Sequence, residues 1–216
     1  SSLQDMIDVI GVSELPTLEL NDYAGLPQSQ GTSGFIVYKS VDQSLKYHST
    51  AAHVANVLYL YPGSSNKTRL PFHSSYYGGD FDFQLHRIPK RLTPKPWITD
   101  NINYDGTPYF REITNSLFSY FMPPGGQVCH YGASSGYSCG TIVATDACIV
   151  VNGTVGCPYI QVRDVQHAPG DSGGPWFLGS VAYGIHHGST DQYTYFMPAE
   201  AYSWKGYNVY TIYMVP

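Results

Sequence analysis

A serine on a glycine-rich turn is the clearest candidate for chemistry in this sequence. Residues 169–175 read Pro-Gly-Asp-Ser-Gly-Gly-Pro, and the apolar run Trp-Phe-Leu follows. Glycines on both sides of Ser172 allow a tight turn whose backbone N–H groups converge, which suits a hole for a developing oxyanion. The pattern predicts that Ser172 is presented to a substrate as a nucleophile; the alternative is a glycine-rich turn with an incidental serine.

A serine hydroxyl is a weak nucleophile at neutral pH, so an imidazole base and an orienting carboxylate must come from elsewhere in the chain. Among the eight histidines, His53 stands out because it follows the small residues Ala51 and Ala52 at a strand end. Asp82 lies at the entry of an alternating strand and is the expected carboxylate. Asp80, two residues earlier on the same strand face, is its rival.

Composition predicts the elements that position these residues. Charged residues make up 12% of the 216, while 22 Gly, 15 Pro and 20 Tyr favour short strands joined by tight turns. We therefore expect an all-β fold. The net charge of −5, with no basic block, argues against nucleic-acid or anionic-membrane partners. No apolar run approaches the length that crosses a bilayer.

Strand-like runs begin at Gly34, after an arm in which a short helix near Leu3 to Ile10 is one option. The expected strands are 34–38, 54–61, 81–88, 127–128, 140–144, 147–151, 159–162, 175–178, 181–185 and 193–197. The proline-rich stretch 89–108 has no sustained period and is interpreted as the connector between two halves. The tail 199–213 is expected to add a helical turn and a last strand.

The four cysteines, Cys129, Cys139, Cys148 and Cys157, are an even count with short spacings that could close two local loops. Three connectivities remain open. Zinc ligation is the alternative, but spacings of ten, nine and nine residues match no zinc-binding pattern. Sequons at Asn66 and Asn152 fit an exported protein.

Three segments together resemble a known family. Thr-Ala-Ala-His at 50–53, Asp-Phe-Gln-Leu at 82–85 and Gly-Asp-Ser-Gly-Gly-Pro at 170–175, in the order His, Asp, Ser, resemble the chymotrypsin-like serine peptidases. Segments 128–142 and 168–172 look like the bacterial branch of streptogrisins, α-lytic proteases and glutamyl endopeptidases. The fold that this implies is two antiparallel six-stranded Greek-key β-barrels with the active site in the cleft between them. Their expected limits are 31–105 and 106–216, after an N-terminal arm, 1–30.

The resemblance implies a role for each matching residue. Ser172 would attack the scissile carbonyl, His53 would shuttle the proton, and Asp82 would hold the imidazole. The N–H groups of Gly170 and Ser172 would bind the oxyanion. Segment 184–189 would form a pocket wall and the edge strand that pairs with substrate. Two disulfides are expected with this fold, Cys129–Cys139 and Cys148–Cys157.

Histidines gather in the segments that should line the specificity pocket. The expected substrate-binding residues are His167, His186, His187, Gly188 and Ser189. No acid obviously marks the base of the pocket, although Arg163 and Asp164 lie near in sequence. Glutamate-specific members of the branch receive a carboxylate with a pocket histidine and serine hydroxyls, so the resemblance predicts a preference for Glu or Asp at the cleaved position. The alternative is an apolar pocket for Phe, Tyr or Leu.

The chain departs from the family in three places. Val54 replaces the cysteine that often follows the catalytic histidine, and the loop before Ser172 lacks a cysteine. The chain begins Ser-Ser, so we expect no activation by an inserted Ile-Val terminus. His130 occupies the place of an arginine that pairs with the aspartate before the nucleophile. We therefore hypothesise a contact between His130 and Asp171 that raises the histidine pKa.

The sequence thus predicts a secreted, monomeric serine endopeptidase that works through an acyl-enzyme, without metal or organic cofactor. Its expected partners are a polypeptide substrate and its own propeptide or a protein inhibitor. A catalytically silent homologue that acts as a binding module is the first alternative. A carbohydrate-binding β-sandwich would explain the tyrosines but not the serine turn, and an α/β-hydrolase esterase would need a GxSxG elbow that is absent.

Overall fold

The computed structural model describes residues 17–20, 31–54, 56, 58–60, 68–102 and 108–214. These residues form mostly β-strands, as expected, with short 3₁₀ helices η1 (Ser119–Phe121), η2 (Ala199–Lys205) and η3 (Ile212–Met214). The strands are β1 (Thr17–Leu20), β2 (Gly31–Thr32), β3 (Ile36–Lys39), β4 (Asp42–Thr50), β5 (Leu58–Leu60), β6 (Thr68–Leu70), β7 (Phe72–Gly78), β8 (Phe81–Arg87), β9 (Trp97–Ile102), β10 (Pro108–Glu112), β11 (Asn115–Ser116), β12 (Gln127–Gly132), β13 (Gly136–Val151), β14 (Thr154–Arg163), β15 (Pro175–Leu178), β16 (Val181–Ser189), β17 (Thr194–Pro198) and β18 (Tyr207–Val209). The helix considered near Leu3 to Ile10 and the sequon at Asn66 lie outside the described residues.

The first half of the chain builds a five-stranded sheet in the order β18-β3-β4-β8-β7. Phe83 and Leu85 alternate with polar residues along β8 and are fully buried beside Phe35 and Val37. Strand β18 comes from the C-terminal end of the chain and pairs with β3. Residues 207–209 therefore belong to this sheet, although the expected division of the chain grouped them with the second half. The division at 105 and 106 itself stays a prediction.

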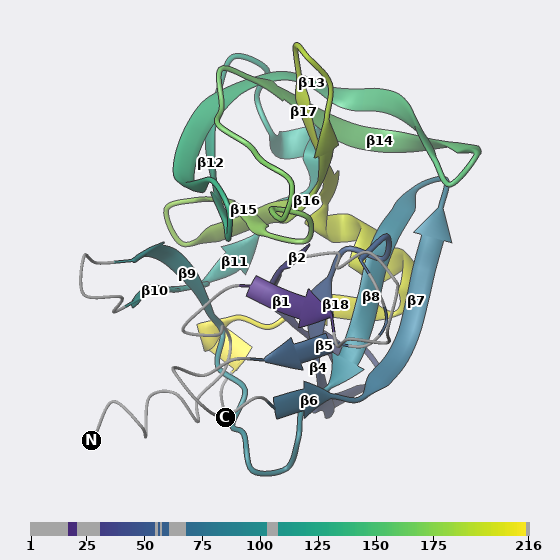
Figure 1. The fold of residues 1–216 in the computed structure, drawn as a ribbon, viewed down its shortest axis with the longest axis vertical. Coiled ribbons are helices and arrows are strands. Elements are labelled where there is room, and N and C mark those ends of the chain that lie inside the picture. Colours follow the sequence, from purple (N-terminus) through teal and green to yellow (C-terminus); the bar gives the residue numbers. More distant parts are fainter. Residues whose placement is uncertain are drawn as a thin grey trace.

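The second half builds a seven-stranded sheet in the order β11-β16-β15-β12-β13-β14-β17, which curls back because β16 also pairs with β17. Trp176, Ile160, Val162 and Phe196 fill its interior. Both expected disulfides are present, Cys129–Cys139 across β12 and β13 and Cys148–Cys157 across β13 and β14. Figure 1 shows this green sheet above the blue strands of the first half.

Several strands lie outside the runs expected from the sequence, and β4, β7 and the β9–β10 hairpin are the longest of them. Strand β13 is continuous over 140–144 and 147–151, which were expected as two strands. Strand β4 reads Asp-Gln-Ser-Leu-Lys-Tyr-His-Ser-Thr, so it has no apolar alternation, and its buried end consists largely of polar groups. Strand β7 lies largely at the surface, so few of its positions require an apolar side chain and its hydrophobic alternation is weak. The connector expected at 89–108 contains β9, which pairs with β10 as a hairpin. Prolines flank these strands rather than exclude them.

The long β13–β14 hairpin reaches from the second sheet to the turn between β7 and β8 (Figure 1). The backbone N–H of Cys157 donates to Asp80 Oδ1 at 2.8 Å. A Cβ on Gly156 would lie 1.8 Å from the carbonyl oxygen of Gly79, so only glycine permits this approach. The hairpin therefore contacts the first sheet at the turn that precedes β8, the strand that carries Asp82.

Candidate active site

Strand register brings His53 and Asp82 together. Thr50 at the end of β4 pairs with Gln84 in the antiparallel β8. Two residues beyond the end of β4 and two residues back along β8, Ala52 therefore faces Asp82. The backbone N–H groups of Ala52 and His53 donate to Asp82 Oδ1 at 2.9 and 3.1 Å. The imidazole of His53 follows directly, with Nδ1 2.7 Å from Asp82 Oδ2.

The Asp82 carboxylate is fully buried and also contacts a second imidazole, that of His187 on β16, through the same oxygen Oδ2. Burial alone would raise the pKa of Asp82. The hydrogen bonds from His187 and His53 outweigh burial and hold that pKa well below its ordinary value. Asp82 is therefore an anion, whereas its rival Asp80 is engaged by the β13–β14 hairpin.

A buried glutamine holds the loop that carries His53. The side-chain Nε2 of Gln84 donates to the carbonyl oxygens of Ala51 and Val54 at 2.8 and 2.7 Å. Its Oε1 lies 3.1 Å from Nε2 of His86, whose Nδ1 lies 3.0 Å from the Leu70 carbonyl. Gln84 belongs to the Asp-Phe-Gln-Leu motif at 82–85, but no function was predicted for it. Gln84 occupies a polar position of the alternation in β8, so nothing in the pattern indicated that its side chain is buried.

The Ser172 side chain meets the same imidazole from the other half of the chain. Ser172 Oγ lies 2.7 Å from His53 Nε2. The next residue, Gly173, has a φ of 87°, and a Cβ there would lie 2.1 Å from Oγ1 of Thr50. The predicted tight turn is thus imposed by close packing against β4. The three predicted residues form one hydrogen-bonded chain, Ser172–His53–Asp82.

Asp171 shapes this turn from within. Its carboxylate accepts backbone N–H groups from Ala168 at 2.7 Å and from Ser134 and Ser135 at 3.1 Å each. The hypothesised contact with His130 is wrong. His130 Nε2 lies 2.7 Å from the Gln166 carbonyl instead, and its Nδ1 has no hydrogen-bond partner among the residues that the structure describes.

The expected direction of the His130 pKa shift is wrong as well. Burial lowers the pKa below its ordinary value, and this effect exceeds the opposing influences of the Gln166 carbonyl and of the Asp171 charge. A buried imidazole without a directly bonded carboxylate favours its neutral form, because desolvation penalises the cation. Backbone N–H groups, and not the predicted His130 side chain, therefore bind the Asp171 carboxylate.

A threonine from the first half holds the serine turn in place, and no sequence pattern indicates this role. Thr32 is fully buried. Its backbone N–H donates to the Ser172 carbonyl at 2.7 Å, and its hydroxyl donates to the Gly170 carbonyl at 2.7 Å. The same hydroxyl accepts the N–H of Ala133 at 2.9 Å. Thr32 therefore links the turn to both halves of the molecule.

The N–H groups of the turn divide into two sets. Those of Asp171, Gly173 and Gly174 donate to backbone carbonyls. For Gly170 and Ser172, no N–H donation to another described residue occurs. The turn thus keeps two backbone donors beside the Ser172 hydroxyl, where an anionic oxygen would be stabilised.

The expected pocket residues separate into three environments. His186 is buried and lies in a stack, with ring centroids 5.7 Å from His130 and 6.2 Å from Trp176. Burial and the neighbouring histidines lower its pKa well below the ordinary value. His167 and Ser189 are exposed and joined by a 2.9 Å hydrogen bond. His187 turns to Asp82 instead, while Gly188 continues β16 between them.

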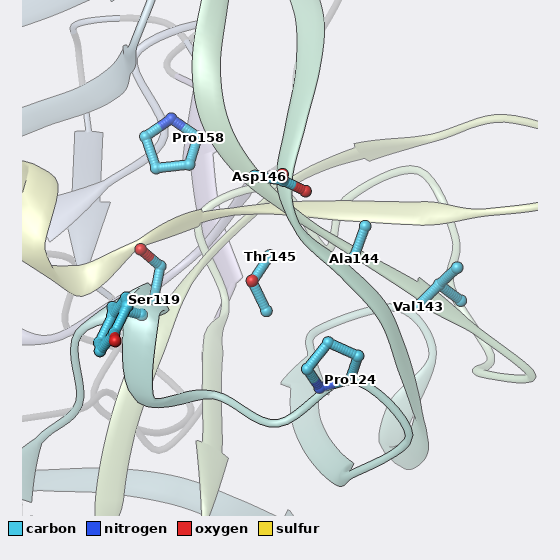
Figure 2. Close-up of a pocket in the computed structure, with 8 residues that line it drawn as sticks. Ser119, Pro124, Val143, Ala144, Thr145, Asp146 and Pro158 are labelled. Atoms are coloured by element: carbon cyan, nitrogen blue, oxygen red, sulfur yellow. The ribbon is translucent and has the colours of Figure 1, made fainter.

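Two hollows of the described surface are lined by residues of the second half of the chain. One lies beside the exposed pair and is lined by Arg163, Gln166, His167, Thr190 and neighbouring residues of both loops. The other, between η1 and β13, is lined by Ser119, Tyr120, Pro124, Val143, Ala144, Thr145, Asp146 and Pro158 (Figure 2). Asp146 is its single charged lining residue, so it offers no acid–base pair.

Fold and site together define the class of protein. The chain has the fold of the chymotrypsin-like serine proteases, and the resemblance to their bacterial streptogrisin, α-lytic and glutamate-specific branch is confirmed. No protein-family model matches the chain. Streptogrisin-C of Streptomyces griseus is 31% identical over 112 residues, 47% of this chain but only 24% of that relative.

Solved structures extend the likeness over most of the chain. Thermobifida fusca protease A has a TM-score of 0.70 at 24% identity, with 93% of this chain and 98% of that chain covered. A glutamic-acid-specific serine protease that uses a histidine triad in substrate binding has a TM-score of 0.68 at 22% identity, with 84% and 94% covered.

Among the described residues, no helix is both long and apolar enough to span a membrane.

Proposed function

We propose that this protein is a serine endopeptidase with Ser172 as nucleophile, His53 as general base and Asp82 as its orienting carboxylate. The observation that carries the proposal is the continuous chain of contacts, 2.7 Å from Ser172 Oγ to His53 Nε2 and 2.7 Å from His53 Nδ1 to Asp82 Oδ2. A catalytically silent homologue is disfavoured because all three groups are present in bonding geometry.

The proposed mechanism follows from where protons reside. Asp82 stays anionic and fixes the His53 proton on Nδ1, so Nε2 is free to accept the Ser172 proton as Oγ attacks the scissile carbonyl. The resulting imidazolium is stabilised by the buried carboxylate and then protonates the leaving amine. Water attacks the acyl-enzyme by the same steps in reverse. No step requires a metal or an organic cofactor.

The tetrahedral oxyanion would lie against the N–H groups of Gly170 and Ser172, the donors that the turn leaves without a described protein partner. The substrate backbone would pair beside β16, but only over its last residues. Strand β15 pairs with β16 along Val181–Ile185. On the same edge, the serine turn forms backbone hydrogen bonds with His186. The edge proposed for substrate is therefore 187–189, which is shorter than the 184–189 expected from the sequence.

For the residue whose carbonyl is attacked, we propose a preference for Glu or Asp. The exposed His167 and Ser189 pair borders a hollow to which Arg163 contributes a cation. His186 and His130 stack with ring centroids 5.7 Å apart. A histidine triad binds substrate in the glutamic-acid-specific protease of similar fold. A carboxylate in the hollow could accept hydrogen bonds from Arg163 and His167. Two acids, Asp164 and Asp191, also line it, and Asp164 lies 3.5 Å from Arg163.

One observation favours a second specificity, for apolar side chains. His186 is buried and its pKa is depressed, so in the unliganded protein it is neutral and packed against Trp176.

Cleavage of a mixed peptide library by the parent protein and by Ser172→Ala, with bonds located by mass spectrometry, tests both the peptidase activity and the residue preferred at the cleaved position. Cleavage by the parent alone supports the peptidase. Equal cleavage after Leu and Glu would exclude the acidic preference.

We further propose that the protein works outside the cytosol and acts on polypeptides as a monomer, with a propeptide or a protein inhibitor as its other partner. The two disulfides support an oxidising compartment, because cytosolic thiols are kept reduced. Size-exclusion chromatography of the purified protein with light scattering tests the monomer directly, and a mass near twice that of one chain would contradict it.

A further inference from the structure

One carboxylate oxygen in this site faces two imidazole nitrogens. Nδ1 of His53 and Nδ1 of His187 both lie within hydrogen-bond distance of Asp82 Oδ2. The ligand atoms of these three residues all lie within 4.8 Å of one another. We propose that His53, Asp82 and His187 form a binding site for a zinc-type divalent ion, whose occupancy reversibly switches the enzyme off. The inhibitory part of this proposal rests on the proposed peptidase function.

The donor set suits a borderline transition metal. Two imidazole nitrogens and one carboxylate oxygen are ligands that zinc accepts, at about 2.0–2.2 Å, with a fourth position open to water. Magnesium and calcium favour oxygen ligands and would be excluded. Ligands of a tetrahedral ion lie about 3.3 Å apart, whereas His53 Nδ1 is now 2.7 Å from Asp82 Oδ2. The rings must therefore separate by somewhat more than half an ångström.

The surroundings permit that movement on one side and anchor the ion on the other. The side chains of His53 and His187 are 26% and 19% exposed, so both rings border solvent. They meet edge to face, with centroids 5.6 Å apart. Asp82 is fully buried, and its other oxygen is fixed by two backbone N–H groups. The carboxylate would hold the ion while the imidazoles swing outward to admit it.

Metal binding at this point would remove the general base without blocking substrate. A neutral imidazole carries one proton, so an ion on His53 Nδ1 moves that proton to Nε2. Nε2 then donates to Ser172 Oγ, the serine keeps its own proton, and no proton can be accepted from it. The ion lies behind the imidazole as seen from Ser172. Zinc should therefore lower kcat and leave KM unchanged.

The first test measures binding alone. Titration calorimetry of the Ser172→Ala protein with zinc chloride should give one ion per chain with Kd at or below about 10 μM, and magnesium should give no heat. His187→Gln in the same background should weaken zinc binding at least about 30-fold. His73→Gln is the matched control, since this half-buried imidazole packs on Tyr47 and Tyr207, and it should leave Kd unchanged.

Equal zinc affinity for the parent and His187→Gln, or no binding up to about 100 μM, would overturn the proposal. If circular dichroism shows that His187→Gln does not fold, anomalous diffraction from zinc-soaked crystals of Ser172→Ala decides instead. A peak must then lie between the three ligand atoms, and a peak elsewhere refutes the site. In the active protein, a chelator should restore kcat. If the parent protein had no peptidase activity, the proposed function would be contradicted, and calorimetry alone would test the zinc site.

Discussion

At the scale of single residues, Asp82 is the most constrained group in the site. Its carboxylate accepts four hydrogen bonds, two from backbone N–H groups and two from imidazoles. Every neighbour is a donor. An uncharged amide in this place would turn an NH₂ group toward one set of donors, whichever way it was oriented.

Asp82→Asn should therefore force the wrong tautomer on His53. An amide NH₂ facing Nδ1 makes that nitrogen an acceptor and puts the proton on Nε2, where it cannot receive the proton of Ser172. We expect kcat to fall by about 10³ to 10⁴, with KM changed by less than about fivefold. Steady-state kinetics on the preferred peptide measures this. A variant with kcat within about tenfold of the parent would show that Asp82 does not orient the base.

Residues with a local pattern could be predicted from sequence, and residues defined by distant contacts could not. Ser172 and His53 each lie beside small residues that mark a turn or a strand end. Thr32 lies in a two-residue strand and acts on a turn 138 positions away. His187 was expected in the pocket because nothing in its neighbourhood in the sequence indicates that its ring turns to Asp82.

At the scale of elements, the serine turn is held by a strand from the other half. Thr32→Val removes the hydroxyl that bonds the Gly170 carbonyl and accepts the Ala133 N–H, while shape and burial stay nearly the same. Two partly buried polar groups lose their partner. The free energy of unfolding should fall by about 1–3 kcal/mol, and kcat should fall because the oxyanion donors lose their support.

The matched control for this prediction is Thr99→Val. Thr99 is also buried, but its hydroxyl has no partner among the described residues. Its replacement should leave kcat unchanged and should not destabilise the protein. Urea unfolding of both variants in a Ser172→Ala background, and kcat in the active background, separates the two. Equal behaviour of Thr32→Val and Thr99→Val would mean that the turn does not depend on Thr32.

The β13–β14 hairpin is the second element that reaches across the molecule. Gly156→Ala would drive a Cβ into the Gly79 carbonyl and push the hairpin off the turn before Asp82. We expect a loss of about 1–3 kcal/mol in the free energy of unfolding and a lower kcat. Val155→Ala, at an exposed site on the same hairpin, should change neither. If Gly156→Ala kept the wild-type unfolding midpoint and kcat, the contact between the hairpin and the turn before Asp82 would not be required.

Element prediction failed where burial is polar. Apolar alternation revealed β8, whereas β4 buries His48, Ser49 and Thr50 through side-chain hydrogen bonds. Such a strand has no hydrophobic period, because its buried groups are satisfied by partners that come from other parts of the chain. The same polar interior explains why this half of the molecule should respond to acid.

At the scale of the whole molecule, the two sheets share one hydrophobic core. Val37 and Leu85 of the first sheet belong to the same buried cluster as Tyr159 and Met197 of the second. The proposed catalytic groups come from both sheets and meet at this junction. Unfolding of either half would therefore separate Ser172 from His53, so stability and activity should be lost together.

Acid should destabilise the molecule through its buried histidines. Burial, with a smaller contribution from the nearby His86, lowers the pKa of His48 from 6.5 to about 3, and burial lowers that of His86 to about 4. Below pH 6.5 these imidazoles take up protons in the unfolded chain but not in the folded one. Stability is complete above pH 6.5 and is lost as pH falls toward the folded values. At pH 5 each histidine costs about 2 kcal/mol.

Urea unfolding of Ser172→Ala between pH 7 and 5 measures this loss without autolysis. His48→Gln in the same background should be less stable at pH 7, because the partner of Ser33 changes, but should lose about 2 kcal/mol less between pH 7 and 5. Carboxylates contribute little in this window, because they titrate mostly below it. Parallel pH curves for the two proteins would contradict the assignment to His48.

The central claim is that His53 and Asp82 activate Ser172. The most direct measurement is labelling with a fluorophosphonate, which reacts with an activated serine, followed by mass spectrometry of the digested protein. We predict a single adduct per chain, on Ser172, and at least about a 10³-fold slower reaction in His53→Ala. No adduct in a folded sample, or an adduct that forms at the same rate without His53, would contradict the account.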